Sequence, residues 1–328
     1  MRTALTARLG IELPIVQAPM GGASNPALAA AVSQAGGLGM LALSWHPPQA
    51  VRAAIRQTRE LTDKPFGVNL VLAFPQAERL AICLEEGVPV ISFFWGDPAP
   101  HVGACHAAGA AVTSTVASAE AACAAAAAGV DVVVAQGLEA GGHVLGEVGT
   151  LPLVRAVAEA VDIPVVAAGG ITDGRGLAAA LTLGAAGVWI GTRFLATAEA
   201  GIHPRYQARL LTAGEGDTFH SALFDGGWPN APHRVLRNAT VEAWEAAGRP
   251  ASGARPGEGE VLATSGGREI RRYASATPGP DAKGDIEALS LWAGQGVGQV
   301  REVKPAADVV REIAAEARAV LRDLAAGS

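Results

Sequence analysis

The sequence predicts an α/β protein built on a (β/α)8 TIM barrel, with a small cap inserted after the eighth strand. Three observations support this prediction. Short runs of β-branched and other apolar residues occur eight times, and an Ala-rich helical stretch follows each of them. The runs begin about 25 residues apart, which is the length of one strand, one helix and two short loops. They are apolar at consecutive positions, as in parallel strands that are covered on both faces.

The predicted strands follow one another without a long crossover, which favours a closed barrel over an open doubly wound sheet. Two of the intervening helices also have recognisable beginnings. Asn25 and Pro26 are typical N-cap and first-turn residues, and Asp173 opens a helix that Gly184 ends. The strands are predicted at Ile15–Pro19, Leu38–Leu43, Pro65–Leu70, Val88–Trp95, Ala111–Val116, Val130–Gln136, Pro164–Gly170 and Gly187–Thr192.

The repeating pattern ends near residue 205. We therefore expect a barrel formed by residues 1–205 and 285–328, and a cap formed by residues 206–284, here called the cap segment. Helical stretches at Tyr206–Ala213 and Asn238–Ala247 alternate there with Gly- and Pro-rich loops, which predicts a mostly helical cap. An amphipathic helix over Ala306–Leu324 is expected to return to the barrel.

Composition excludes several classes of partner. The net charge is −6, which argues against nucleic acid and anionic membranes because both require clustered Lys and Arg. The apolar stretches are shorter than the roughly 20 residues that span a bilayer, and the N-terminus resembles no export signal. The 3 cysteines lack the spacing of a disulfide framework or a metal site. We therefore expect a cytoplasmic protein that binds neither nucleic acid nor a membrane.

The predicted strand ends exclude several chemistries, because the active site of a (β/α)8 barrel lies there. A Schiff-base enzyme needs a lysine at a strand end, but Lys64, Lys283 and Lys304 lie elsewhere. A catalytic metal needs several Asp, Glu or His side chains, whereas the strand ends carry neutral residues, so we expect no metal site. All the cysteines fall in predicted helices, which excludes a cysteine nucleophile of this barrel type.

Glycines follow the seventh and eighth predicted strands, where many barrels hold a ligand phosphate through backbone N–H groups. Ala168, Gly169 and Gly170 end the seventh strand, and Gly191 and Thr192 end the eighth. Glycine lets the backbone approach a ligand closely, and the threonine adds a hydroxyl. Either pair alone would equally fit a tight turn. Their occurrence at both strands favours a phosphate site.

Other polar residues are predicted at the mouth of the barrel. His143 follows two glycines after the sixth strand, where the glycines leave room for a flat cofactor. Histidine titrates near neutrality, which makes His143 the candidate general base, with an exposed loop histidine as the alternative. The thioether of Met20 suits contact with an aromatic ring. The amides of Asn69 and Gln136 need partners if they are buried, and a cofactor ring would provide them.

Taken together, these motifs resemble the flavin-dependent nitronate monooxygenases, formerly called 2-nitropropane dioxygenases. The similarity spans nearly the whole chain in order, although the cap segment contains no matching motif. The matching segments are Pro14–Gly22, Ala35–Gly39, Lys64–Asn69, Val134–His143, Val166–Gly174, Ile190–Phe194 and Ser290–Gln295.

The resemblance implies a barrel that holds FMN without a covalent link. His143 would be catalytic and would take the α-proton of a nitroalkane or orient a nitronate. The nitronate and O2 would yield a carbonyl compound and nitrite without NAD(P)H. The residues implied to bind the cofactor are Ala18, Pro19, Met20, Asn69, Gln136, Gly141, Gly142, Ala168, Gly169, Gly170, Gly191, Thr192, Trp292 and Gln295.

Two alternative functions stay open. NAD(P)H-dependent relatives in the same superfamily, an enoyl-acyl carrier protein reductase and quinone reductases, share the glycines and the histidine. The Gln17–Met20 segment favours the nitronate branch over these reductases. A catalytically idle flavin-binding barrel is the other alternative, and the placement of His143 argues against it. A homodimer through the C-terminal helix or the cap is also left open.

Overall fold

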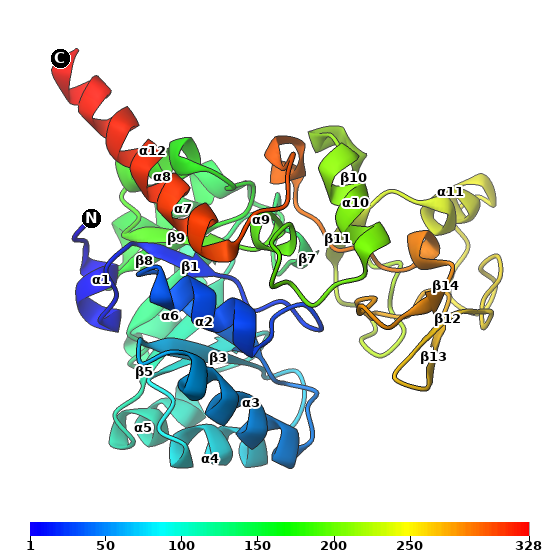
Figure 1. Cartoon of the computed structure of the whole chain (residues 1–328), viewed down its shortest axis with the longest axis horizontal. Helices are drawn as coiled ribbons and strands as arrows, with labels where there is room; N and C mark the ends of the chain where they lie inside the picture. The colour runs from blue at the N-terminus through cyan, green and yellow to red at the C-terminus, as the bar shows by residue number, and fades with distance from the viewer. Residues whose placement is uncertain (328) are drawn as a thin grey trace.

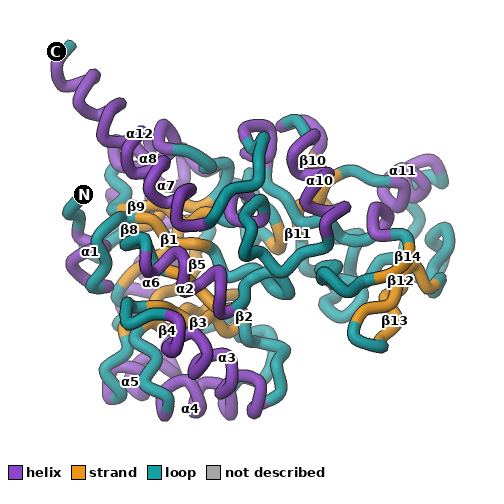
Figure 2. Tube along the Cα trace, viewed as in Figure 1, coloured by secondary structure: helices purple, strands orange, loops and turns teal. Residues whose placement is uncertain are grey.

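The computed structural model describes residues 1–327, in which parallel strands and their surrounding helices occupy one side of the molecule and most of the cap segment the other (Figures 1 and 2). The strand order is β1, β9, β8, β6, β5, β4, β3, β2, and a bridge between Val16 and Leu38 closes the ring. The predicted barrel is confirmed, and the open doubly wound sheet is excluded. The strands are β1 (Ile15–Gln17), β2 (Gly39–Ala42), β3 (Phe66–Val71), β4 (Val90–Phe94), β5 (Ala111–Val116), β6 (Val132–Gln136), β8 (Val165–Ala168) and β9 (Gly187–Ile190).

Both predicted helix caps are present. The side chain of Asn25 accepts a hydrogen bond from the N–H of Leu28 at 2.9 Å, and Asp173 accepts one from Gly176 at 2.8 Å. Each bond satisfies one of the N–H groups that the first turn of a helix leaves without a partner. The helices of the barrel are α2 (Pro26–Gln34), α3 (Pro48–Leu61), α4 (Ala77–Glu85), α5 (Ala99–Ala107), α6 (Ala119–Ala127), α7 (Thr150–Ala160), α8 (Gly174–Thr182) and α9 (Thr192–Leu195).

A short helix that was not predicted, α1 (Ala4–Leu9), covers the N-terminal end of the barrel. Its buried side chains Leu5 and Leu9 join the apolar cluster that fills the barrel interior, together with Val132 and Val166. The side chain of Thr3 caps the helix. Because apolar packing fills this end of the barrel, the polar and glycine-rich site lies at the opposite end.

The cap segment differs from the prediction of a mostly helical unit. It does contain α11 (Ala239–Ala246), and α10 (Pro204–Thr212) leads into it, close to both predicted helical stretches. It also contains short strands, which form two three-stranded sheets. One sheet joins β10 (Thr218–Ser221) and β11 (His233–Leu236) to β7 (Gly142–His143), and the other joins β12 (Val261–Ser265), β13 (Arg268–Arg271) and β14 (Lys283–Gly284).

The hairpin of β12 and β13 does have a signal in the sequence. Gly266 and Gly267 form its two-residue turn, with φ of 56° and 75°. Positive φ at both turn residues matches the twist of the flanking strands, and two glycines adopt it without steric cost. The strands are too short and too exposed for periodicity alone to predict them, which is why the cap was expected to be mostly helical.

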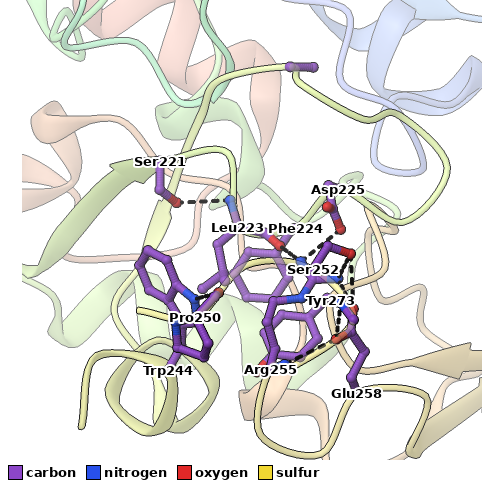
Figure 3. Close-up of polar contacts among 12 residues, drawn as sticks. Ser221, Leu223, Phe224, Asp225, Trp244, Pro250, Ser252, Arg255, Glu258 and Tyr273 are labelled. Atoms are coloured by element: carbon purple, nitrogen blue, oxygen red, sulfur yellow. Dashed lines mark hydrogen bonds and ion pairs between the residues drawn. The ribbon is translucent and has the colours of Figure 1, made fainter. Parts of the chain in front are cut away.

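A buried arginine holds the Gly- and Pro-rich loop of the cap segment in place (Figure 3). The side chain of Arg255 is only 7% exposed, and it donates hydrogen bonds to Asp225 at 2.9 Å and to the carbonyl of Leu223 at 3.0 Å. The same guanidinium pairs with Glu258 and lies 4.2 Å from the ring centroid of Tyr273. These contacts hold the loop, residues 249–259, against residues 223–225, which directly precede the cavity-lining residues Gly227 and Trp228.

The C-terminal helix α12 (Ala306–Ala326) returns to the barrel as predicted. It packs along α8, where the side chain of Glu316 accepts a hydrogen bond from the N–H of Gly174 at 2.8 Å. Its last turns extend past the barrel in Figure 1. Short 3-10 turns η1 (Glu215–Asp217), η2 (Ile286–Ala288) and η3 (Gln295–Gln299) complete the connections. None of the helices in residues 1–327 is long and apolar enough to cross a membrane.

Candidate active site

A cavity of about 640 Å³ lies at the C-terminal ends of the barrel strands, where residues of the cap segment complete its wall. Gln295 is the one predicted site residue that does not line it. Its side chain is exposed, while the neighbouring Gly294 and Gly296 line the cavity instead. The predicted residues that do line it are Ala18, Pro19, Met20, Asn69, Gln136, Gly141, Gly142, His143, Ala168, Gly169, Gly170, Gly191, Thr192 and Trp292.

Glycines form a cradle at one side of this cavity. Gly169 and Gly170 follow β8 with φ of 113° and 69°, a conformation that L side chains rarely adopt. Within residues 1–327, the N–H groups of Gly170 and Gly191 have no hydrogen-bond acceptor. Thr192 accepts a hydrogen bond from the N–H of Gly294 at 3.0 Å, which leaves its own hydroxyl proton for a ligand. The carboxylate of the neighbouring Glu139 is bound by the N–H and hydroxyl of Thr150, each at 2.8 Å, and free N–H groups of this kind suit a phosphate.

The two amides behave differently. The side chain of Asn69 is 6% exposed and has no hydrogen-bond partner in the described part of the chain, so it is available to a ligand. Gln136, in contrast, donates to the carbonyl of His143 at 3.0 Å and accepts from the N–H of Leu145 at 3.1 Å. Gln136 therefore has protein partners without a cofactor, although it lines the cavity and keeps a second N–H. Its amide supports the strand that carries His143.

His143 lies in β7, which pairs with β11 so that His143 faces His233. The imidazole stacks on Trp228 with ring centroids 4.1 Å apart and an interplanar angle of 29°, and the ring of Trp292 lies 5.4 Å away. Neither ring nitrogen has a hydrogen-bond partner in residues 1–327, and Nε2 is buried. A buried polar atom without a partner indicates a place for a ligand.

Burial lowers the pKa of His143 to about 3, and the neighbouring His233 lowers it further. The pKa of His233 is itself lowered to about 4, chiefly by burial. Its ring is held by the carbonyl of Ala231 at 2.9 Å and by the N–H of Phe224 at 3.1 Å. Both histidines are therefore neutral at physiological pH. A neutral imidazole with free nitrogens can accept a proton or donate a hydrogen bond.

These lowered pKa values predict an acid-sensitive fold. The unfolded chain binds protons at both histidines below pH 6.5, whereas native His143 binds its proton only near pH 3. The free energy of unfolding should therefore fall as the pH drops from 6.5, by about 2 kcal/mol for each histidine at about pH 5. His143→Phe should remove about half of this loss in urea titrations. An unchanged pH dependence in that variant would contradict the assignment.

The bridging role of Gln136 gives a second prediction. Gln136→Leu leaves the carbonyl of His143 and the N–H of Leu145 without partners, which should lower the free energy of unfolding by about 2 kcal/mol and reduce turnover. Ser33→Ala is the matched control, because its hydroxyl also bridges two backbone groups but lies at the other end of the barrel. The control should lose stability and keep its turnover per folded molecule. Equal turnover in the two variants would refute the role of Gln136.

Several cavity residues were not predicted. Trp228 and Arg268 belong to the cap segment, where the sequence offers no matching motif, and Trp45 follows β2. Arg268 is the one charged residue among those that line the cavity; it is exposed, and its side chain makes no ion pair or hydrogen bond within residues 1–327. An unpaired arginine is not visible in a sequence, because its partners depend on the fold. A tryptophan in a Gly-Gly-Trp loop is a signal that could have been used.

Comparisons with known proteins agree with this geometry. A family model described as nitronate monooxygenase matches residues 2–79 and 72–316. A nitronate monooxygenase from Pseudomonas aeruginosa is 36% identical, over 97% of this chain and 100% of its own. An octahydro-indene-carboxyl-CoA dehydrogenase from Rhodococcus jostii is 43% identical, over 76% of this chain and 69% of its own.

A solved structure, FabK from Thermotoga maritima, has the same fold, with a TM-score of 0.84, 35% identity and full coverage of both chains. The family match extends over both the barrel and the cap segment, and it includes the strand of His143 and the glycine cradle. The chain therefore belongs to the nitronate monooxygenase family, and it is a flavin-dependent oxidoreductase.

Proposed function

We propose that this protein holds FMN in the cavity and oxidises nitronates, and nitroalkanes after their deprotonation, with O2 to a carbonyl compound and nitrite. The observation that carries the proposal is the unpartnered imidazole of His143 in the same cavity as the glycine cradle. The imidazole would accept a proton from the substrate, and the glycine cradle would bind the phosphate of the cofactor.

The residues present fit FMN. The N–H groups of Gly170 and Gly191 and the hydroxyl of Thr192 would hold the phosphate, and the amide of Asn69 would reach the polar atoms of the ring. Met20 would contact the ring through its thioether. When bound, the flavin supplies the transfer of electrons from the nitronate to O2.

His143 would act on the substrate directly. Its neutral imidazole would accept the α-proton of a nitroalkane at a ring nitrogen and hold it while the nitronate reacts. The negative charge of the nitronate would favour the protonated ring, because an opposite charge nearby raises the pKa of a histidine. With a nitronate supplied from solution, the same ring would orient the anion. Trp228 and Trp292 would exclude water from this step.

The test is anaerobic mixing. The purified protein should be yellow with an FMN spectrum, and ethyl nitronate should bleach it while NADH and NADPH leave it oxidised. A colourless protein that cannot be reconstituted with FMN would refute the flavin site. Bleaching by NADH and not by the nitronate would refute the nitronate reaction.

A second candidate is an NAD(P)H-dependent flavin reductase, and Arg268 is the observation that favours it. This unpaired cation at the cavity would receive a phosphate of a nucleotide. The similarity to FabK is in keeping with this candidate, and the similarity to the carboxyl-CoA dehydrogenase favours a ligand that carries phosphates, as CoA does. If this candidate is correct, NADPH should bleach the flavin, and Arg268→Gln should raise the NADPH concentration that is needed.

A further inference from the structure

We propose that Trp45, Phe94 and Trp228 form an aromatic subsite that binds an aryl or fused-ring carbon skeleton of the substrate. The inference rests on the proposed function, since it names the substrate class that the same cavity takes. All three side chains line the cavity, and each comes from a different part of the chain. The subsite therefore forms only when the barrel and the cap segment come together.

Trp228 is the centre of the subsite. Its ring centroid lies 6.1 Å from that of Trp45 and 6.5 Å from that of Phe94. Behind these rings, Phe74 packs edge-on against Trp228 at 5.3 Å and Trp95 does so at 5.1 Å. Such tilted and edge-to-face arrangements are the favourable geometries for aromatic pairs, and they fix the rings that face the cavity.

The backbone around the subsite is also constrained. Trp95 has a φ of 61°, which is unfavourable for a bulky residue and persists where the surroundings hold it. On the cap side, the N–H of Trp228 donates to the carbonyl of Asp225 at 3.0 Å, and Arg255 holds the side chain of Asp225. The loop that carries Trp228 is therefore held through Asp225, which binds Trp228 by its carbonyl and Arg255 by its side chain.

Trp45 is the member with the least contact to the protein. It is 52% exposed, and it lines a cavity in which a bound ligand would cover its ring. A large aromatic side chain left open next to a cavity gains apolar contact when a ligand ring packs on it. The three rings that line the subsite are uncharged, which favours an apolar ring over a polar or ionic group.

The subsite lies next to His143. Trp228 contacts both Trp45 and the imidazole of His143, the latter at 4.1 Å between centroids. Trp228 is therefore shared by the subsite and by the packing around His143, and a ring bound at the subsite occupies the same cavity as the imidazole. The proposed substrate class is a nitro compound that carries an aryl or fused ring.

The experiment compares two nitronates in variants of the FMN-loaded enzyme. For Trp45→Ala, kcat/KM with the nitronate of phenylnitromethane should fall about three- to tenfold, the effect of losing one aromatic pair. With ethyl nitronate, it should change less than about twofold. Trp45→Phe should restore most of the loss. Leu61→Ala, a similarly exposed apolar side chain on α3, is the control and should affect neither substrate.

Binding is measured separately by calorimetry with indole, a fused-ring probe that undergoes no nitronate chemistry. Wild type should bind indole, and Trp45→Ala should bind it several-fold more weakly. Equal losses with both nitronates, or indole binding that Trp45→Ala leaves unchanged, would overturn the subsite. If wild type oxidises neither nitronate, the proposed function fails, and the indole titration still decides whether the aromatic subsite exists.

Discussion

His143→Ala should keep its FMN but lose about 10²- to 10⁴-fold of its turnover with neutral nitroethane, the contribution of a positioned general base. The reason is that no other side chain lining the cavity in residues 1–327 titrates as a base, since Arg268 is the one charged residue there. With preformed ethyl nitronate the loss should be far smaller, because the proton has already left. Oxygen consumption with the two substrates measures both rates.

His101→Ala serves as the control for this variant. Its ring lies on α5, 5.4 Å from Phe93 and away from the cavity, so both rates should be unchanged. FMN content and the melting temperature should be compared for all three proteins. Unchanged turnover of nitroethane in His143→Ala would remove this residue from proton transfer. An equal loss with nitroethane and ethyl nitronate would assign it to orientation of the substrate alone.

Gly141→Ala should empty the cofactor site and lower the free energy of unfolding by about 1–3 kcal/mol. A Cβ at this position would lie 2.4 Å from the backbone nitrogen of Gly294 and 2.5 Å from the carbonyl carbon of Ala293. These atoms cannot rotate away, because the hydroxyl of Tyr206 holds the carbonyl of Trp292 next to them. The strand of His143 and the 292–294 segment must separate, which opens the cavity between them.

Gly109→Ala is the matched control for Gly141→Ala. A Cβ at this position, which does not line the cavity, would meet nothing within 4 Å, although the residue has a φ of 78°. The substitution should therefore cost about 1–2 kcal/mol of backbone strain and leave FMN bound. Thermal unfolding and the flavin-to-protein absorbance ratio distinguish the two variants. If Gly141→Ala retains FMN as well as Gly109→Ala does, the close approach of the two segments does not shape the site.

The barrel could be predicted from the sequence because its strands are buried on both faces and its helices carry caps. Asn25 and Asp173 form local bonds, so a few neighbouring residues determine them. The position of Gly169 and Gly191 in the cavity could also be predicted, because the order of the strands determines which loops share one end of the barrel.

Other features of the site depend on contacts between distant parts of the chain. Gln136 has its expected position at the end of β6, but its partners on the His143 strand follow from the path of the loop. The stacking of Trp228 on His143 depends on a cap loop held by Arg255. Gln295 was expected at the cavity because it belongs to a matching motif, and a 3-10 turn directs its side chain outward.

The pairing of β7 with β11 has a consequence for how such an enzyme can diversify. The strand of His143 is one edge of a sheet whose other strands belong to the cap segment, and backbone hydrogen bonds hold it there. Backbone bonds do not depend on which side chains the strands carry. Substitutions can therefore remodel the cap wall and change substrate preference while the histidine keeps its place. The same pairing opposes any motion that lifts the cap away as a rigid lid, because such a motion would pull the histidine out with it.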